Sequence, residues 1–155
     1  MIKLNNMRLQ LVSLTGLKYD DDAYEVVIPT AEGGIAVYEG HMPLVSIAVP
    51  GVLTVRKHKS DSDAARQEYA VAGGVVEIDG QSVRILVDEA EKAEDIVEAE
   101  ARAAYEQAQK LKAQATTQVE IEKAQALMDR HAVRLHVADL RRRHSRRPSP
   151  DHSEQ

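Results

Sequence analysis

Residues 33–44 read Gly33-Gly34-Ile35-Ala36-Val37-Tyr38-Glu39-Gly40-His41-Met42-Pro43-Leu44. A second stretch, residues 69–78, reads Tyr-Ala-Val-Ala-Gly-Gly-Val-Val-Glu-Ile. Each stretch joins a glycine pair to a short run rich in β-branched residues, which is typical of strands bounded by tight turns. Because a strand and not a helix follows each pair, turns or bulges of a β-sandwich are favoured over a phosphate-binding loop.

The first part of the chain, residues 7–88, has the alternation of β-strands. Apolar residues occupy every second position in three segments, namely Leu9 and Leu11; Tyr24, Val26 and Ile28; Val83, Ile85 and Val87. Turn signals separate the runs at 20–22, 32–34, 39–40, 50–51 and 79–80. Short strands at this spacing predict a sandwich or barrel, with residues 57–67 as a polar hairpin loop.

From Glu94 onward the composition is helical. Residues 81–147 contain no Gly or Pro, and good helix formers dominate. A helix-packing seam steps by four and three residues through Val97, Ala101, Ala104, Ala108, Leu111 and Ala115. Glu94 and Asp95 are expected in the first turn, where the helix dipole favours acids. Residues 115–118 are the expected turn between two helices, although a single long helix stays possible.

The second predicted helix, about residues 119–143, is apolar on two sides. One side carries Ile121, Ala124, Met128, Leu135 and Ala138, and the other carries Val119, Ala126, Val133, Val137 and Leu140. Such a helix needs two partners, the first helix and either the β-domain or another protein. A helix buried in one larger intramolecular core is the alternative. After Arg143 the chain has no apolar residue, which predicts a disordered tail.

Composition excludes several classes of protein. The 155 residues contain no Cys, Phe or Trp, so disulfides and thiolate chemistry are absent and the core must use aliphatic residues. The first residues lack the apolar run of a signal peptide and no stretch approaches a membrane span, so a soluble, cytoplasmic protein is expected. The net charge is −5, yet residues 130–147 are rich in arginine and hold one acid, Asp139. Such a block seeks an acidic partner or stays solvated.

The sequence offers no residue set for catalysis or metal binding. His131 and His136 are five residues apart, off the spacing of four that brings two imidazoles to one metal. We expect no metal and no cofactor, and we interpret His131 as an interface histidine. The arginine clusters could bind nucleic acid, but no aromatic residues interleave them, so protein docking is favoured.

The two glycine-containing stretches and the Ala-rich helical region that follows them resemble the epsilon subunit of the bacterial F-type ATP synthase, the equivalent of mitochondrial delta. The resemblance covers about residues 7–143. It implies an α+β fold, with an N-terminal antiparallel β-sandwich followed by a C-terminal two-helix antiparallel hairpin. The implied boundaries are 1–92 for the sandwich, 93–144 for a regulatory hairpin and 145–155 for the tail.

The resemblance also implies a function without catalysis. Subunits of this family lie in the central stalk, or rotor, where the sandwich touches the gamma subunit and the c-ring and turns with both during ATP synthesis and proton transport. Their hairpin folds against the sandwich or extends along gamma towards the beta and alpha subunits, where it inhibits ATP hydrolysis. A peripheral position on the cytoplasmic face of the bacterial inner membrane is implied.

By position, the resemblance implies c-ring contact through Glu32, Gly33, Gly34, Ile35, Glu39 and His41, expected at one end of the sandwich. The chain departs from the family pattern, which usually has an acid at Gly34, Gly at Ala36 and often Pro at Glu39. Glu32 or Glu39 could supply the charge instead. His41 is interpreted as either a loop-fixing residue or a direct partner contact.

The hairpin carries two further implied sites. When it is extended, an acidic helix-turn-helix of the beta subunit would meet Arg130, Arg134, Arg141, Arg142 and Arg143. Some family members bind ATP through Ile-Asp-x-x-Arg-Ala on the hairpin. The matching residues 96–101 have Val97 for the Asp and Glu100 for the Arg, and a carboxylate cannot donate to phosphate as a guanidinium does. We therefore expect weak or no ATP binding.

Two other classes stay open from the sequence. One is a stand-alone nucleotide-sensing regulatory domain whose hairpin closes on a nucleotide, and calorimetry with ATP would identify it. The other is a β-sandwich adaptor with a basic nucleic-acid tail, which would bind DNA in a salt-dependent way.

Overall fold

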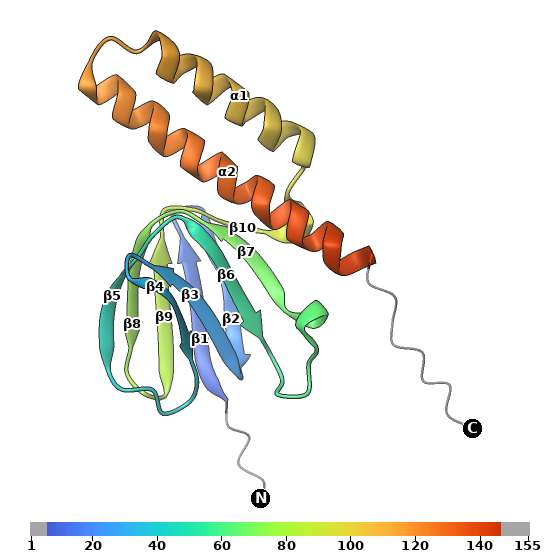
Figure 1. The fold of residues 1–155 in the computed structure, drawn as a ribbon. Coiled ribbons are helices and arrows are strands. Elements are labelled where there is room, and N and C mark those ends of the chain that lie inside the picture. Colours follow the sequence, from blue (N-terminus) through green and yellow to red (C-terminus); the bar gives the residue numbers. More distant parts are fainter. Residues whose placement is uncertain (1–5, 147–155) are drawn as a thin grey trace, which may run out of the picture.

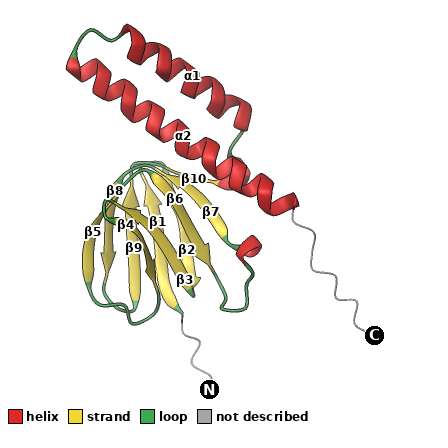
Figure 2. Cartoon of the chain, in the orientation of Figure 1, coloured by secondary structure: helices red, strands yellow, loops and turns green. Residues whose placement is uncertain are grey.

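The computed structural model describes residues 6–146. In this part of the chain, ten strands form a β-sandwich and two α-helices fold over one end of it as a hairpin (Figures 1 and 2). The predicted α+β class, a β-sandwich followed by a two-helix hairpin, is confirmed.

The strands are β1 (Met7–Ser13), β2 (Gly16–Ala23), β3 (Glu25–Thr30), β4 (Gly33–Val37), β5 (Leu44–Ala48), β6 (Gly51–Arg56), β7 (Gln67–Val71), β8 (Gly74–Ile78), β9 (Ser82–Val87) and β10 (Ala90–Lys92). Their order is β10-β7-β6-β3-β5-β8-β9-β1-β2, and β4 pairs with β3 off this path. Among the described strands, β1 and β9 depart from the predicted antiparallel pairing and run parallel. They are far apart in the chain, so no hairpin turn fixes their relative direction.

Successive strands alternate in direction, so their turns gather at two ends of the sandwich (Figure 1). The turns that follow β1, β3, β5, β7 and β9 lie at the end nearest the helices, which we call the hairpin end. The turns that follow β2, β4, β6 and β8 lie at the opposite end, which we call the distal end. This division decides which candidate residues can share one partner.

The core follows the period-two pattern of the sequence. Leu9, Leu11 and Ile85 are fully buried between the layers, as their alternation predicts. Glu25 is an exception, because it is buried at a position that the pattern places on the polar face. Its carboxylate lies 3.6 Å from the Arg56 guanidinium and 3.2 Å from that of Arg66, and these ion pairs compensate the loss of water.

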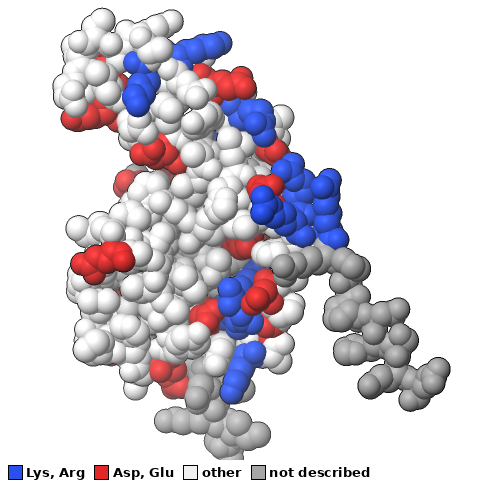
Figure 3. Space-filling model, viewed as in Figure 1, with Lys and Arg blue, Asp and Glu red and all other residues white. Residues whose placement is uncertain are grey.

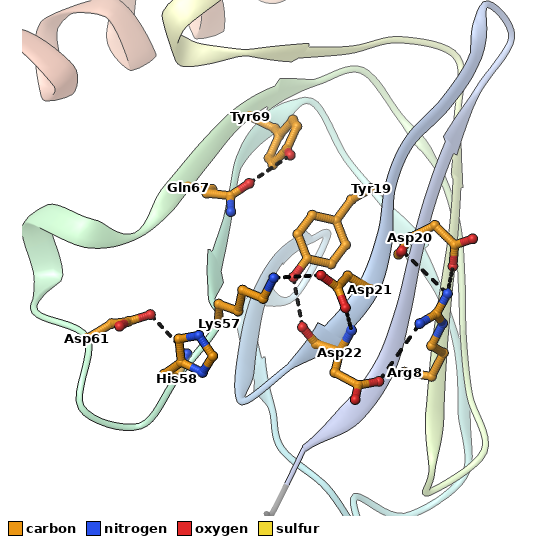
Figure 4. A network of polar contacts seen from close by, with 10 residues as sticks. All are labelled: Arg8, Tyr19, Asp20, Asp21, Asp22, Lys57, His58, Asp61, Gln67 and Tyr69. Carbon is orange, nitrogen blue, oxygen red and sulfur yellow. Dashed lines mark hydrogen bonds and ion pairs between the residues drawn. The ribbon is translucent and has the colours of Figure 1, made fainter.

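The acidic run Asp20–Asp22, predicted as a turn, lies instead within β2 at the edge of the sheet. Figure 4 shows how neighbouring cations hold it there: Arg8 lies 2.6 Å from Asp20, and Lys57 lies 2.6 Å from Asp21. The hydrogen bond from Lys57 lowers the pKa of Asp21. Charged side chains on an edge strand also discourage pairing with other chains.

The hairpin consists of α1 (Glu98–Gln114) and α2 (Gln118–Arg146), preceded by a short 3-10 helix, η2 (Ala93–Asp95). The predicted helix start at Glu94 is therefore four residues early. The backbone is extended at Ile96, whose buried side chain packs between hairpin and sandwich, and this interrupts the helix. At the other end, α2 reaches Arg146, two residues into the predicted tail, and residues 147–155 lie outside the described part.

The predicted turn at 115–118 separates the two helices. A capping box fixes it: the Glu120 amide donates to the Thr117 hydroxyl, and the Glu120 carboxylate accepts from the amides of Thr116 and Thr117. These amide hydrogen bonds lower the pKa of Glu120. This capped turn excludes the single long helix that the sequence left open as an alternative.

Gly74 is required by close packing between β8 and β9. A Cβ there would lie 1.9 Å from the Leu86 carbonyl oxygen, which is backbone and cannot rotate away. At Gly34 a Cβ would meet only the Val27 side chain, at 3.7 Å. Of the two glycine pairs, therefore, only the second, Gly73-Gly74, includes a glycine whose replacement by a larger residue would clash with the backbone.

We expect Gly74→Ala to lower the free energy of unfolding by about 1–3 kcal/mol, since overpacking forces the backbone to shift. Gly34→Ala is the matched control and should change it by much less. Urea denaturation of both variants measures the difference, and equal stabilities would contradict the packing argument.

Candidate functional site

The C-terminal half of α2 docks on the sandwich beside β6, β7 and η2 (Figure 1). One apolar cluster joins the two parts and consists of Val52, Ala70, Ala93, Ile96, Ala101, Val133, Leu135, Val137 and Ala138. Val137 is fully buried in it. The two partners expected for this helix are thus α1 and the β-domain.

Charged groups border this apolar contact. Arg130 lies 3.1 Å from Glu89, and Arg134 forms a two-pronged pair with Glu91, at 2.6 Å and 3.3 Å. Both acids lie at or just before β10, so the two pairs tie α2 to the sandwich. Because Arg134 is largely buried, its pair is screened less by water than the exposed ones.

The other three arginines with a predicted beta-subunit contact also have partners within the chain. Arg141 donates to the carbonyl oxygens of Ala93 and Glu94 at the end of η2. Arg142 pairs with Glu98 and Asp139, and Arg143 pairs with Asp139 while its side chain stays 75% exposed. In Figure 3 this end of α2 forms a basic cluster. These internal pairs would compete with another protein for the arginines, least of all for the exposed Arg143.

The six residues with an implied c-ring contact do not lie at one end of the sandwich. Glu32 lies in the turn after β3 and Gly33 begins β4, both at the hairpin end, and Gly33 has a φ of 116° that favours glycine. Glu39 and His41 follow β4 and lie at the distal end, where the Gly40 amide donates to Gly80. The expectation of a common end is wrong, because β4 carries the chain from one end to the other.

His41 makes a local contact. Its Nδ1 lies 2.8 Å from the Met42 carbonyl oxygen, within the same loop. This geometry favours the loop-fixing interpretation over direct partner contact.

The outer face of the sandwich carries apolar side chains that the sequence patterns do not reveal. Cross-strand neighbours place one row of them across five strands near the hairpin end: Ile47, Val75, Leu86, Val12 and Leu17. We call this row the outer stripe. Apart from the half-buried Val12, its members are 41–67% exposed. The next row towards the distal end is mainly polar, with Glu77, Arg84 and Gln10.

A contiguous exposed apolar row of this kind is a candidate protein-docking surface. The residues of the stripe become neighbours only through the pairing of their strands. In the sequence, the stripe is visible only as single apolar residues at outward-facing positions, such as Leu86 between Ile85 and Val87.

A cleft of about 740 Å³ separates the hairpin end from the N-terminal half of α2.

The positions of the ATP-binding motif also lack a phosphate-binding arrangement. Val97 precedes the first turn of α1, and Glu100 is exposed in that turn. The nearby Arg102 pairs with Glu98 at 3.2 Å. Within residues 6–146 there is no group of three or more His, Cys, Asp or Glu that could hold a metal. The same region contains no helix long and apolar enough to cross a membrane.

A β-sandwich that carries an apolar outer stripe and a docked helical hairpin is the architecture expected of a subunit that binds other proteins. Residues 6–93 match the family described as ATP synthase, Delta/Epsilon chain, beta-sandwich domain. The chain is 32% identical over 138 residues to the ATP synthase epsilon chain of Chromobacterium violaceum, covering 89% of this chain and 93% of that one. It is 33% identical over 135 residues to the epsilon chain of Sulfurihydrogenibium sp., covering 86% and 98%.

Solved structures agree on the fold. A chain of the Euglena gracilis mitochondrial ATP synthase superposes with a TM-score of 0.72 at 21% identity, covering 86% of this chain and 81% of that one. A chain of the Tetrahymena thermophila central stalk and c-ring gives 0.58 at 16% identity, covering 85% and 96%. The protein belongs to the ATP synthase delta/epsilon family. It is a non-catalytic, epsilon-type subunit of that complex.

Proposed function

We propose that this subunit couples a gamma-type stalk subunit to the c-ring and restrains ATP hydrolysis through its hairpin. The outer stripe carries the proposal, because exposed aliphatic side chains across five strands fit a permanent partner better than water. The partners are gamma, the c-ring and, for the extended hairpin, the beta and alpha subunits. The protein would be held by the complex at the cytoplasmic face of the bacterial inner membrane.

Within this function, we assign the stripe to gamma and the β3–β4 turn, Glu32–Ile35, to the c-ring. Glu39 and His41 lie at the other end of β4, so a ring that meets the turn is out of their reach. A stand-alone nucleotide sensor is the second candidate from the sequence. Glu100 speaks against it, because it stands where the ATP-binding motif has Arg, and a carboxylate cannot donate hydrogen bonds to a phosphate.

The outer stripe is tested by introducing charge into it. Ile47→Asp and Leu86→Asp should each weaken binding to purified gamma by about tenfold or more, since a carboxylate would be buried against apolar surface. Met42→Asp is the matched control, because the Met42 side chain is 71% exposed but lies in the loop after β4 at the distal end, away from both the stripe and the hairpin. Calorimetric titration measures the affinities for gamma. Unchanged binding by both stripe variants would contradict the assignment of gamma to this face.

The ring assignment is tested by cross-linking in the assembled complex. The chain has no native Cys, so single substitutions give unambiguous products. We expect Glu32→Cys to cross-link to a cysteine placed in the polar loop of the c subunit, and His41→Cys to give no such product. The reverse pattern would move the ring contact to the distal end.

The inhibitory role is tested by replacing Arg141, Arg142 and Arg143 together with Ala. Loss of the hydrogen bonds from Arg141 should loosen the docked hairpin and thereby favour extension. A fall in inhibition of ATP hydrolysis by the assembled enzyme would therefore have to come from lost contacts with beta, and this is the expected result. Unchanged or stronger inhibition would contradict the proposal that contact of these arginines with beta outweighs their role in docking.

A further inference from the structure

His131 occupies the junction between the hairpin and the sandwich. It is 9% exposed, and its Nδ1 lies 3.2 Å from a terminal nitrogen of Arg134. A guanidinium can only donate hydrogen bonds. The Nδ1 atom must therefore act as the acceptor, so this arrangement requires a neutral ring with its proton on Nε2.

The charged groups around His131 come from two elements. Arg130 and Arg134 flank it on α2, and Glu89 and Glu91 face it from the start of β10. The cleft next to Arg130 adds the acids Asp88 and Asp129 and the cation Lys123. α1, the other element packed against α2, presents apolar residues on its buried face, Ala101 and Ala108.

We propose that His131 makes the docking of the hairpin on the sandwich sensitive to pH. A proton on Nδ1 removes the acceptor for Arg134 and places a third cation between Arg130 and Arg134. The two guanidinium groups are then less well held on Glu91 and Glu89, the pairs that border the apolar contact of α2. The proposal concerns the isolated chain and stands or falls independently of the assignments to gamma and the c-ring.

The direction of the effect follows from the surroundings of the ring. Burial lowers the pKa of His131 below its ordinary value of 6.5, Arg134 and Arg130 lower it further, and Glu89 and Glu91 act in the opposite direction. In the undocked hairpin the ring is solvated and takes up its proton near that ordinary value. Docking is therefore fully stabilised above pH about 6.5 and weakens as the pH falls through it towards the docked pKa.

A second pair of titratable groups lies in the same contact. His144 lies 3.5 Å from the buried carboxylate of Glu68 on β7. Burial raises the pKa of Glu68, while His144, His136 and Arg66 lower it. The raised pKa of Glu68 favours docking as the pH falls, opposite to His131, so His144→Gln together with Glu68→Gln provides the background in which this pair no longer contributes.

The experiment uses two spin labels on the full chain, at Lys110→Cys on α1 and Lys18→Cys on β2, both exposed positions. Distance distributions from pH 8 to pH 5 give the ratio of undocked to docked hairpin. In the background with both His144→Gln and Glu68→Gln, this ratio should rise below pH about 6.5, by at most about tenfold per pH unit, the limit for one proton. Adding His131→Gln should flatten the curve, whereas the control His58→Gln, in the exposed β6–β7 loop, should leave it unchanged.

Titration of the imidazole NMR signals of the unaltered chain gives an independent reading, which holds even if His131→Gln fails to dock at pH 8. His131 should titrate below the ordinary histidine value of 6.5, together with amide shifts across the contact between α2 and the sandwich. The proposal is overturned if the His131→Gln curve retains the pH dependence. It is equally overturned if the pKa of His131 is at or above the ordinary value of 6.5 while the hairpin stays docked.

Discussion

The packing of α2 against two partners at once determines the shape of this molecule. A helix with apolar residues on opposite sides leaves one side in water unless something covers it. α1 covers one side with small residues, which allow close approach, and the sandwich covers the other around Val137. The extended backbone at Ile96 serves the same contact, because it redirects the chain and contributes a buried side chain to the cluster.

The docked hairpin and any second protein would compete for the same arginines of α2. Each of the five has acidic or carbonyl partners within the chain, and the chain holds these partners at high effective concentration. A second protein that takes these arginines must replace the internal pairs and must also compensate for exposing the apolar cluster. Exposed pairs such as Arg143 with Asp139 contribute little, so the apolar contact and the buried pair of Arg134 dominate the balance.

Periodicity predicted most of the fold, because each strand and helix shows its buried face within a few residues of sequence. It predicted the strands around Leu9 and Ile85 and the two helices with the turn at 115–118. It missed the cap of α2, although Thr117 and Glu120 have the spacing of a capping box. It also misplaced Asp20–Asp22, since a run of aspartates indicates a turn unless cations from other strands neutralise it.

The candidate surfaces were harder to predict, because they depend on register and strand direction. Gly33 and His41 are eight positions apart, yet five residues of β4 at about 3.3 Å each carry the chain from one end of the sandwich to the other. The outer stripe has the same origin: Ile47, Val75 and Leu86 come from three strands and become neighbours only through pairing. A shift of one residue in any of these strands would turn these side chains into the core. The register that closes the core therefore also creates the docking face, and a change that alters one must alter the other.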